Sequence, residues 1–593
     1  MPIEYLSRAA RSELLKRGIT ADLNGQTFVN GAQDVILTSV IREFVNRALS
    51  HMGAADHSAA NEYLKHLIDT PANREEKTTL QNVTLDLIRM HITSLIRAAI
   101  RGDDKPLQQF AESLAKLDIV DQDTSRDLLL ESFVEFVDVL TDDFSLQDLQ
   151  PSAIAILMDL HSQTMPAARS RMENLVKESS SRIIGATVFL EIYHRLLVLR
   201  QWLRLDDKVP HFGRILAGKV IAAEQSTGCN RSVYTSILAI NQQELSSVAA
   251  GDRVTNLECI IATAVSFYRL TNTEGQEDLE ASMSKFCKTM TPSDYSEALD
   301  CIWDGLSDPS MSESDLVTLV RLSSLFMHNS PEGSLKINQS HWSKCLELFA
   351  NRPQFLDEPA LATAVLESIA KKVNDRPASL RQQDLSSLWS ILGSCVAGSS
   401  QHRGTTSHQI FRELVSVISA LVRLRRDLVV STLPHLGIVL RRLILCLKHL
   451  QPQLGAKQSR IVASSLPKWI NLTDPLTVED SKAIARLLTT LTTKTVARTH
   501  STSTSTQKAE SLARPFSKHA AHVLGGYIDA LNDPLSFLPA DIRRELQPGL
   551  FALCEMMGEQ NRDSMMVTLD TGGKTVMKTL WRDYEKQRYT GKG

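Results

Sequence analysis

The pattern that most resembles a chemical motif is Gly573-Lys574-Thr575, which has the ending of a phosphate-binding loop. Such a loop cradles phosphate with main-chain N–H groups between a strand and a helix. Here the position five residues before Gly573 is Thr568, where the loop needs glycine. The segment also follows an expected helix instead of a strand. The pattern therefore does not predict nucleotide binding.

Two other patterns contain residue types that can bind a metal or transfer protons. His519 and His522 have a helical spacing that could share a metal, but no cysteine or carboxylate joins them locally. Asp142 and Asp143 lie in an acidic run with no partner base. The motifs of zinc proteases, serine hydrolases and dinucleotide-binding domains are missing. We therefore expect a non-enzymatic protein with no cofactor, no metal and no small-molecule substrate.

Charge is distributed unevenly, although the formal net charge is only −3. Acidic residues dominate between residues 101 and 161, and basic residues dominate between residues 403 and 468. A basic segment can neutralise RNA phosphates, or it can face an acidic protein or solvent. No aromatic platform interleaves the arginines, so base stacking is not predicted. The candidate surface for a partner or RNA consists of Arg423, Arg425, Arg426, Arg441 and Arg442.

The elements that carry these residues all have helical periodicity. Apolar residues make up 43% of the chain and aromatic residues only 5%, which favours helices over β-sandwiches. Roughly twenty-five helices joined by short polar loops are typical of an α-solenoid. Among them we expect separate helices over 153–161 and 167–177, and single helices over 183–205 and 429–450. The sequence predicts an all-α fold, an irregular α-solenoid of HEAT- or armadillo-like helix pairs, with separate bundles as the alternative.

A polar, low-complexity segment interrupts the helices near residue 500. Thr499 to Thr506 contains only Ser, Thr and one His, which is too polar to pack. We interpret residues 1–498 as the solenoid, 499–509 as a Ser/Thr-rich linker and 510–593 as a small C-terminal helical domain. The linker is either an unmodified connection or a phosphorylated tether. We expect the domain to fold with little help from upstream helices.

Prolines and glycines divide the C-terminal domain. Pro548 is expected to open a helix, because proline fits the first turn and disrupts an interior. Gly558 is expected to close that helix, and Asp570 or Thr571 to cap the last one. On the last helix, the side chains of Leu580, Trp581 and Tyr584 are expected to face the core.

This succession resembles the C-terminal domain of a nucleolar family that processes large-subunit pre-rRNA, called unhealthy ribosome biogenesis protein two. The matching residues are Pro534-Leu535, Ile542 to Leu546, Pro548 to Leu553, Leu569-Asp570, Gly573, Lys578 to Leu580 and Asp583-Tyr584. The resulting family motif for packing or docking comprises Arg543, Arg544, Glu545, Leu546, Pro548, Gly549, Trp581 and Tyr584. Arg543 and Arg544 could pair with a partner or RNA phosphate, or with Glu545 and Asp541.

The resemblance implies a function, a location and partners. It implies a non-catalytic scaffold in the nucleus and nucleolus that supports pre-rRNA processing during early assembly of the large ribosomal subunit. The implied partners are a second helical scaffold and a DEAD-box RNA helicase, with direct contact to pre-rRNA left open. Family members are usually longer, so this chain looks short for the family, and whether an N-terminal half is missing is left open. Without the resemblance, a cytoplasmic α-solenoid adaptor in transport or trafficking is the alternative.

Two further features bear on location. The eight cysteines are far apart and form no Cys-x-x-Cys pair, which suits reduced thiols in the cytosol or nucleus. The first residues contain no apolar run of a signal peptide. The most apolar segment, residues 428–450, is interrupted by Pro434, Arg441 and Arg442, so we expect it to be buried or interfacial and expect no membrane contact.

Overall fold

The computed structural model describes residues 77–115, 128–205, 210–223, 231–245, 252–270, 273–399, 407–494 and 511–590. The helices expected before residue 77 and the predicted linker at 499–509 lie outside these ranges, so the predicted domain boundaries stay predictions. The chain divides into two compact units, Met1–Leu279 and Glu280–Gly593.

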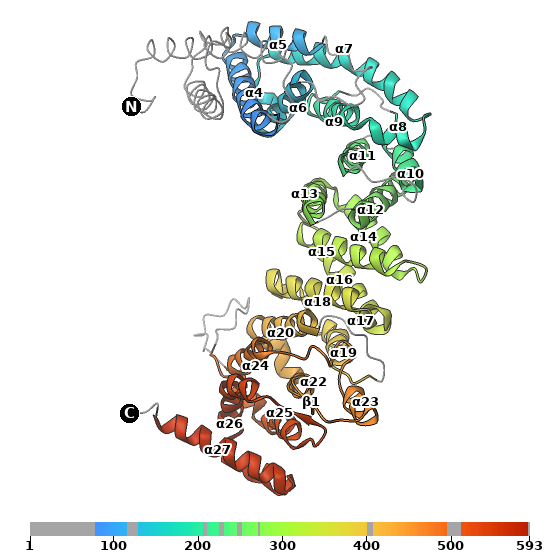
Figure 1. Cartoon of the computed structure of the whole chain (residues 1–593). Coiled ribbons are helices and arrows are strands. Elements are labelled where there is room, and N and C mark those ends of the chain that lie inside the picture. Colours follow the sequence, from blue (N-terminus) through green and yellow to red (C-terminus); the bar gives the residue numbers. More distant parts are fainter. Residues whose placement is uncertain are drawn as a thin grey trace, which may run out of the picture. The chain divides into compact units, whose positions relative to one another are not determined.

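The described part of the first unit is a succession of packed helices (Figure 1). In one row α4 packs on α6, α6 packs on α9, and α9 packs on α11. In addition, α5 packs on α7, and α10 is contacted by both α8 and α12. The elements are α4 (Lys77–Ile100), α5 (Lys105–Ala115), α6 (Leu128–Asp143), η3 (Leu146–Asp148), α7 (Pro151–Leu175), α8 (Ser180–Gly185), α9 (Thr187–Trp202), α10 (Gly213–Ala223), α11 (Arg231–Glu244), α12 (Arg253–Leu270) and α13 (Thr273–Thr289), which runs into the second unit.

Two helix boundaries in this unit differ from the sequence prediction. The helices expected over 153–161 and 167–177 form one helix, α7, with Pro166 inside it. Pro166 and Ser162 are both exposed, so water can bond the Ser162 carbonyl that lacks a helical donor. The helix expected over 183–205 is instead divided at Ala186, whose main chain leaves the helical range between α8 and α9.

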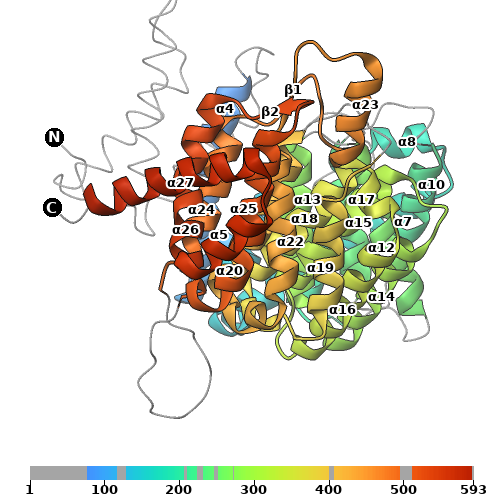
Figure 2. The ribbon, with the colours of Figure 1, turned by 90° about the horizontal axis from the view of Figure 1, so that it is seen from below.

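The second unit consists of two rows of helices (Figure 2). One row stacks α15, α18, α20, α24 and α26, and the other stacks α14, α16, α19, α22 and α25. The elements are α14 (Pro292–Ser307), α15 (Glu313–His328), α16 (Leu335–Asn351), α17 (Gln354–Asp357), α18 (Pro359–Asp375), η6 (Pro377–Ser379), α19 (Asp384–Cys395), α20 (Ser407–Leu424), α21 (Arg426–Val429), η7 (Val430–Thr432), α22 (Leu433–Leu445), β1 (His449–Leu450), α23 (Ala456–Ser465), α24 (Val478–Thr490), α25 (Ala513–Asn532), β2 (Ser536–Phe537), α26 (Ala540–Thr568) and α27 (Thr571–Thr590). This arrangement confirms the predicted all-α, solenoid-like class.

Local sequence explains how these helices begin and how the rows meet. Before α14, the Thr291 hydroxyl accepts a hydrogen bond from the Asp294 N–H at 3.2 Å. Pro292 then occupies the first turn of the helix. Inside the unit, the buried Tyr295 hydroxyl donates to the Phe326 carbonyl at 3.1 Å and also contacts Asn338. One α14 side chain thereby connects α14, α15 and α16.

The helix expected over 429–450 is shorter than predicted. The chain forms α21 and η7 first, and α22 begins at Leu433 with Pro434 in its first turn. The segment after α22 becomes β1, which pairs antiparallel with β2, with His449 opposite Phe537. Arg426–Leu445 has the length and apolar character of a membrane span, and half of it is buried. Because α22 packs against α25, the segment forms part of the core of this unit, as expected.

Candidate docking surface

Helix α26 crosses α24 at the glycine of the family motif. A Cβ on Gly549 would lie 2.9 Å from the Ala485 Cα and 3.0 Å from the Leu488 Cδ1. The neighbouring Leu546 and Leu550 are fully buried. Only glycine permits this approach of the two helices, so this part of the family motif is a packing device.

Pro548 does not open a helix, contrary to the sequence prediction. Helix α26 continues through it, and Pro548 and Arg544 one turn earlier are both exposed. Pro548 has no N–H to donate to the Arg544 carbonyl. Because this carbonyl lies on the solvated side of the helix, losing the hydrogen bond costs little free energy there. The interruption occurs at Gly558, whose φ of 68° is left-handed. The predicted closure at Gly558 is confirmed.

The last helix, α27, is capped and anchored as the sequence predicts. The Asp570 Oδ1 accepts a hydrogen bond from the Gly573 N–H at 2.7 Å, which caps its first turn. Met577, Leu580, Trp581 and Tyr584 are buried on its inner face. The Trp581 indole N–H donates to the Glu585 carboxylate at 2.8 Å, and its ring meets Tyr584 edge-on at 5.4 Å.

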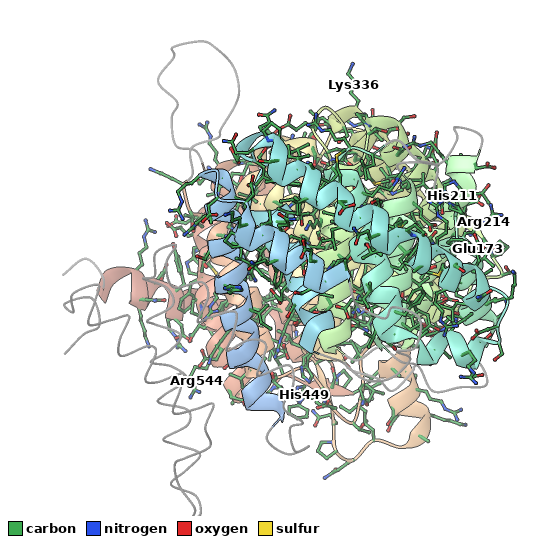
Figure 3. All side chains as sticks on the ribbon, turned by 90° about the horizontal axis from the view of Figure 1, so that it is seen from above. Glu173, His211, Arg214, Lys336, His449 and Arg544 are labelled. Carbon is green, nitrogen blue, oxygen red and sulfur yellow. The ribbon has the colours of Figure 1, made fainter. Side chains whose placement is uncertain are left out.

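An open groove lies between α26 and α27. Its volume is about 1070 Å³, and it is lined by Arg544, Gln547, Pro548, Phe551, Arg582, Asp583, Glu585, Lys586 and Gln587. Figure 3 shows the Arg544 side chain on the outside of the fold. Arg544 is 74% exposed and lies 3.4 Å from Glu545, so it has one of the alternative partners considered above. Arg543 is also exposed.

The helices of the C-terminal segment share their core with upstream helices. Helix α25 packs on α22, and α26 packs on α24. The Lys448 ammonium also bonds the Asp533 carboxylate at 2.8 Å. This sharing differs from the expectation of a domain that folds with little upstream help, because removing α25 and α26 would uncover apolar side chains of α22 and α24.

Three of the five arginines proposed as a partner or RNA surface bond main-chain carbonyls of other elements of the protein. Arg425 donates to the Pro377 carbonyl at 2.7 Å and to the Leu380 carbonyl, and it forms an ion pair with Asp427 at 2.9 Å. Arg426 donates to the Thr490 carbonyl at 3.2 Å, and burial lowers the pKa of its guanidinium group. These contacts connect successive helices, so we correct the interpretation of both residues as free phosphate ligands.

Arg441 is the third, and it connects α22 to α25. Its guanidinium donates to the His522 carbonyl at 2.9 Å and forms an ion pair with Asp529. A Cβ on Gly525 or Gly526 would come within 2.8 Å of the Arg441 side chain. The two glycines thus make room for the arginine, which has a structural role here.

Arg423 and Arg442 remain candidates for a partner or RNA contact. Both are exposed. Arg423 lies 3.5 Å from Asn374, whereas Arg442 has no side-chain hydrogen bond or ion pair to any described residue. Because the other three arginines are used internally, the proposed basic surface is reduced to two separate cations.

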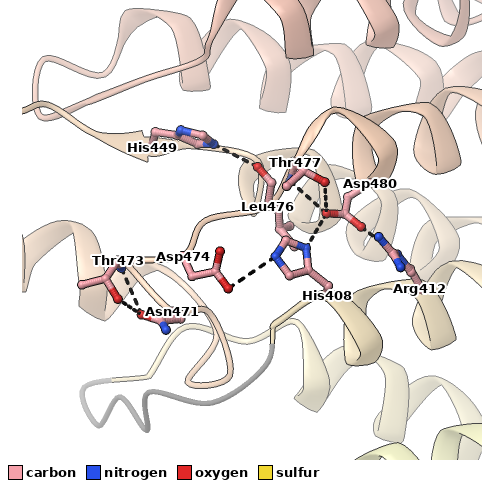
Figure 4. A network of polar contacts seen from close by, with 9 residues as sticks. All are labelled: His408, Arg412, His449, Asn471, Thr473, Asp474, Leu476, Thr477 and Asp480. Carbon is pink, nitrogen blue, oxygen red and sulfur yellow. Dashed lines mark hydrogen bonds and ion pairs between the residues drawn. The ribbon is translucent and has the colours of Figure 1, made fainter.

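A polar network that the sequence analysis missed joins α20 to α24 (Figure 4). The fully buried Asp480 carboxylate accepts from the Thr477 N–H at 2.8 Å and contacts the His408 Nδ1 at 2.7 Å and the Arg412 Nε at 3.1 Å. Burial raises the pKa of this carboxyl, but the hydrogen bonds from Thr477, His408 and Arg412 outweigh it and hold the pKa below its usual range. The capping pattern Thr477-x-x-Asp480 was the available signal.

The remaining chemical patterns form no site in the described part of the chain. Within these ranges, no cluster of three or more His, Cys, Asp or Glu side chains could hold a metal ion. His519 packs its ring against Phe516 at 5.8 Å, and Gly573 belongs to the first turn of α27. Seven cysteines are described, and each is a free thiol.

Fold and surface together define a helical-repeat protein whose last helices carry a polar groove. Residues 363–592 match the model of the Urb2/Npa2 family. The C-terminal part of the chain therefore matches this family, as the resemblance predicted. The family takes part in ribosome biogenesis, is generally nuclear or nucleolar and is not known to be enzymatic.

Similarity to other known proteins is weak. No curated protein matches the sequence significantly. Importin beta is similar over 94% of this chain and 72% of its own, with 9% identity and a TM-score of 0.30. The UNC-45 chaperone is similar over 96% and 71%, with 10% identity and a TM-score of 0.24. Human Puf-A is similar over 87% and 100%, with 11% identity and a TM-score of 0.20. Scores this low support no functional argument.

Proposed function

We propose that the protein is a non-catalytic nucleolar scaffold that supports pre-rRNA processing in early assembly of the large ribosomal subunit. The observation that carries this proposal is the Urb2/Npa2 match over residues 363–592. The matched segment begins within α18 and includes the helices that form the α24–α26 crossing and the groove. The matched region is thus wider than the last eighty residues and includes the later helices of both rows of the second unit.

The proposed partners are a second helical scaffold, a DEAD-box RNA helicase and pre-rRNA. Two features support an exposed docking role for the α26–α27 groove. Phe551 and Pro548 give it apolar surface, and Arg544 and Arg582 add exposed positive charge beside Asp583 and Glu585. Mixed charge around an apolar centre is suited to a protein partner.

Localisation of a fluorescent fusion of the full chain tests the proposed function. We expect the signal to coincide with a nucleolar marker in living cells. A cytosolic or vesicular pattern, with exclusion from the nucleolus, would contradict the proposal and favour the transport adaptor.

Affinity purification tests the role of the groove. Arg544→Glu reverses a charge that is largely exposed, so the fold should persist. We expect the variant to recover less of the assembly factors from nuclease-treated extract than the parent does. Lys336→Glu, an equally large charge change on α16, is the matched control and should recover as much as the parent. Equal recovery by all three proteins would show that docking does not use the groove.

A further inference from the structure

Helix α27 presents a regular line of cations that the basic run at residues 403–468 does not include. Lys574, Lys578, Arg582 and Lys586 follow one another at intervals of four residues. This spacing places them on one side of a helix, about 6 Å apart along its axis. We call these four residues the α27 basic stripe.

The buried face of α27 fixes the direction of this stripe. Met577 and Trp581 pack inward, whereas Lys578, Arg582 and Lys586 are exposed and Lys574 is half-exposed. Figures 1 and 2 show α27 crossing the end of the second unit, where it contacts α25 and α26. Because the anchoring side chains set the rotation of the helix, the four cations are held in a line instead of being spread around it.

Three of the four cations of the stripe, Lys574, Lys578 and Arg582, have no ionic partner among the residues that the structure describes. No acidic residue occurs between Thr571 and Arg582. The adjoining Thr575 and Thr579 hydroxyls donate to carbonyls of their own helix, each at 3.0 Å. The first twelve residues of α27 thus contain three basic residues and no acidic one.

The composition of this face favours nucleic acid over protein. Protein interfaces are typically depleted of lysine in their centre and enriched in aromatic and methionine side chains. Nucleic-acid interfaces are more polar and more positive. Within its described residues, α27 exposes no large apolar side chain, because Trp581, Tyr584 and Met577 all face inward. A line of cations beside short hydroxyl side chains is therefore suited to a phosphate backbone.

We propose that the α27 basic stripe binds the backbone phosphates of RNA without reading its bases. Two residues of the stripe, Arg582 and Lys586, also line the groove in which Arg544 of α26 is the proposed protein contact. The absence of an exposed aromatic platform on the described part of α27 excludes stacking as the source of affinity there. This inference rests on the proposed function, for which it supplies the direct RNA contact.

Binding of the purified full chain to a fluorescein-labelled single-stranded oligouridine tests the proposal. The triple variant Lys574→Gln, Lys578→Gln, Arg582→Gln should bind roughly tenfold or more weakly at moderate salt. The slope of log affinity against log salt should fall by about 2, at about 0.7 per phosphate contact. A mixed-sequence RNA should behave in the same way, because the contacts are to phosphates.

The matched control removes three exposed cations elsewhere in the second unit. Lys336→Gln, Lys371→Gln, Arg321→Gln changes the net charge equally, at positions outside the basic run, and should leave affinity and slope unchanged. Circular dichroism and the melting temperature should be the same for all three proteins. An equal loss in the control would mean that only net charge matters and would overturn the proposal.

Three other results would also overturn it. The proposal is wrong if the parent binds no RNA. It is also wrong if the triple variant keeps the parental slope of log affinity against log salt. A variant that keeps RNA affinity but loses protein partners from nuclease-treated extract would show that α27 is a protein-binding face. Co-sedimentation of the parent with ribosomal precursors tests the proposed function separately, so each idea can fail without the other.

Discussion

Gly549 of α26 lies directly against Ala485 of α24, with space for a hydrogen but not for a methyl group. The contact explains why a glycine follows Pro548 in the family motif. The proline lies on the exposed side of α26, whereas the glycine lies on the side that meets α24. The family motif thus marks the position where α26 crosses α24. This crossing holds α26, and with it one wall of the groove between α26 and α27, in place.

Gly549→Ala should destabilise the protein. A helical glycine replaced by alanine ordinarily gains up to about 1 kcal/mol. Here the new Cβ would overlap the Ala485 main chain, and overpacking costs about 1–3 kcal/mol. Gly393→Ala on α19 is the control, because its Cβ would meet nothing within 4 Å and the change should be neutral or stabilising. Chemical denaturation of the full chain measures both, and equal effects would contradict the close crossing.

Arg425→Met and Arg441→Met should each reduce stability, because both arginines bond main-chain carbonyls of neighbouring elements. Leaving such acceptors unpaired costs about 1–3 kcal/mol. Arg423→Met and Arg442→Met, at exposed positions, should stay within about 0.5 kcal/mol of the parent. Thermal unfolding followed by circular dichroism distinguishes the two pairs. If Arg425→Met or Arg441→Met lost RNA affinity without losing stability, that residue would belong to an RNA-binding surface, as one of the interpretations of the sequence proposed.

Asp480→Asn should cost about 3 kcal/mol at neutral pH, because it removes the charged acceptor from a buried, bonded pair. The folded state holds the pKa of the Asp480 carboxyl below its ordinary value of 3.8. The stabilisation is therefore complete above that value and is lost as pH falls through the lower folded pKa. Denaturation at several pH values should show the gap between parent and variant narrowing in acid. A constant gap would contradict the charged state assigned here.

Trp581→Ala should loosen α27. The ring is 8% exposed, lies 4.9 Å from the Arg562 guanidinium and bonds Glu585. Truncating a buried tryptophan costs about 3–5 kcal/mol. Limited proteolysis should cut the variant within α27 earlier than the parent. Val567→Ala, at a position that is 81% exposed, should be cut at the parental rate.

Periodicity alone predicted the helical class and the anchors of α27, because Leu580, Trp581 and Tyr584 recur on one side of a helix. It also placed the closure at Gly558, where a positive φ needs glycine. The errors at Pro166 and Pro548 have a common cause. Both prolines are exposed, so the main-chain bond that each removes can be replaced by water, and the helix continues.

The basic run shows what composition could not predict. The sequence shows an excess of arginines. It does not show that three of them donate to the carbonyls of Pro377, Thr490 and His522, because these bonds depend on which helices become neighbours. Those neighbours lie roughly 50 to 80 residues away in the chain, beyond the reach of local patterns. The four-residue spacing of the α27 basic stripe is present in the sequence, but spacing alone does not show which side of the helix is buried.

Gradient sedimentation of the tagged full chain from growing cells tests the scaffold proposal most directly. We expect the protein to migrate with large-subunit precursors, and we expect its depletion to lower the amount of mature large subunit while small subunits persist. The Arg544→Glu variant should migrate at least partly with the free protein, whereas Lys336→Glu should follow the parent. Migration of the parent only at the top of the gradient, with normal subunit levels after its depletion, would contradict the scaffold function.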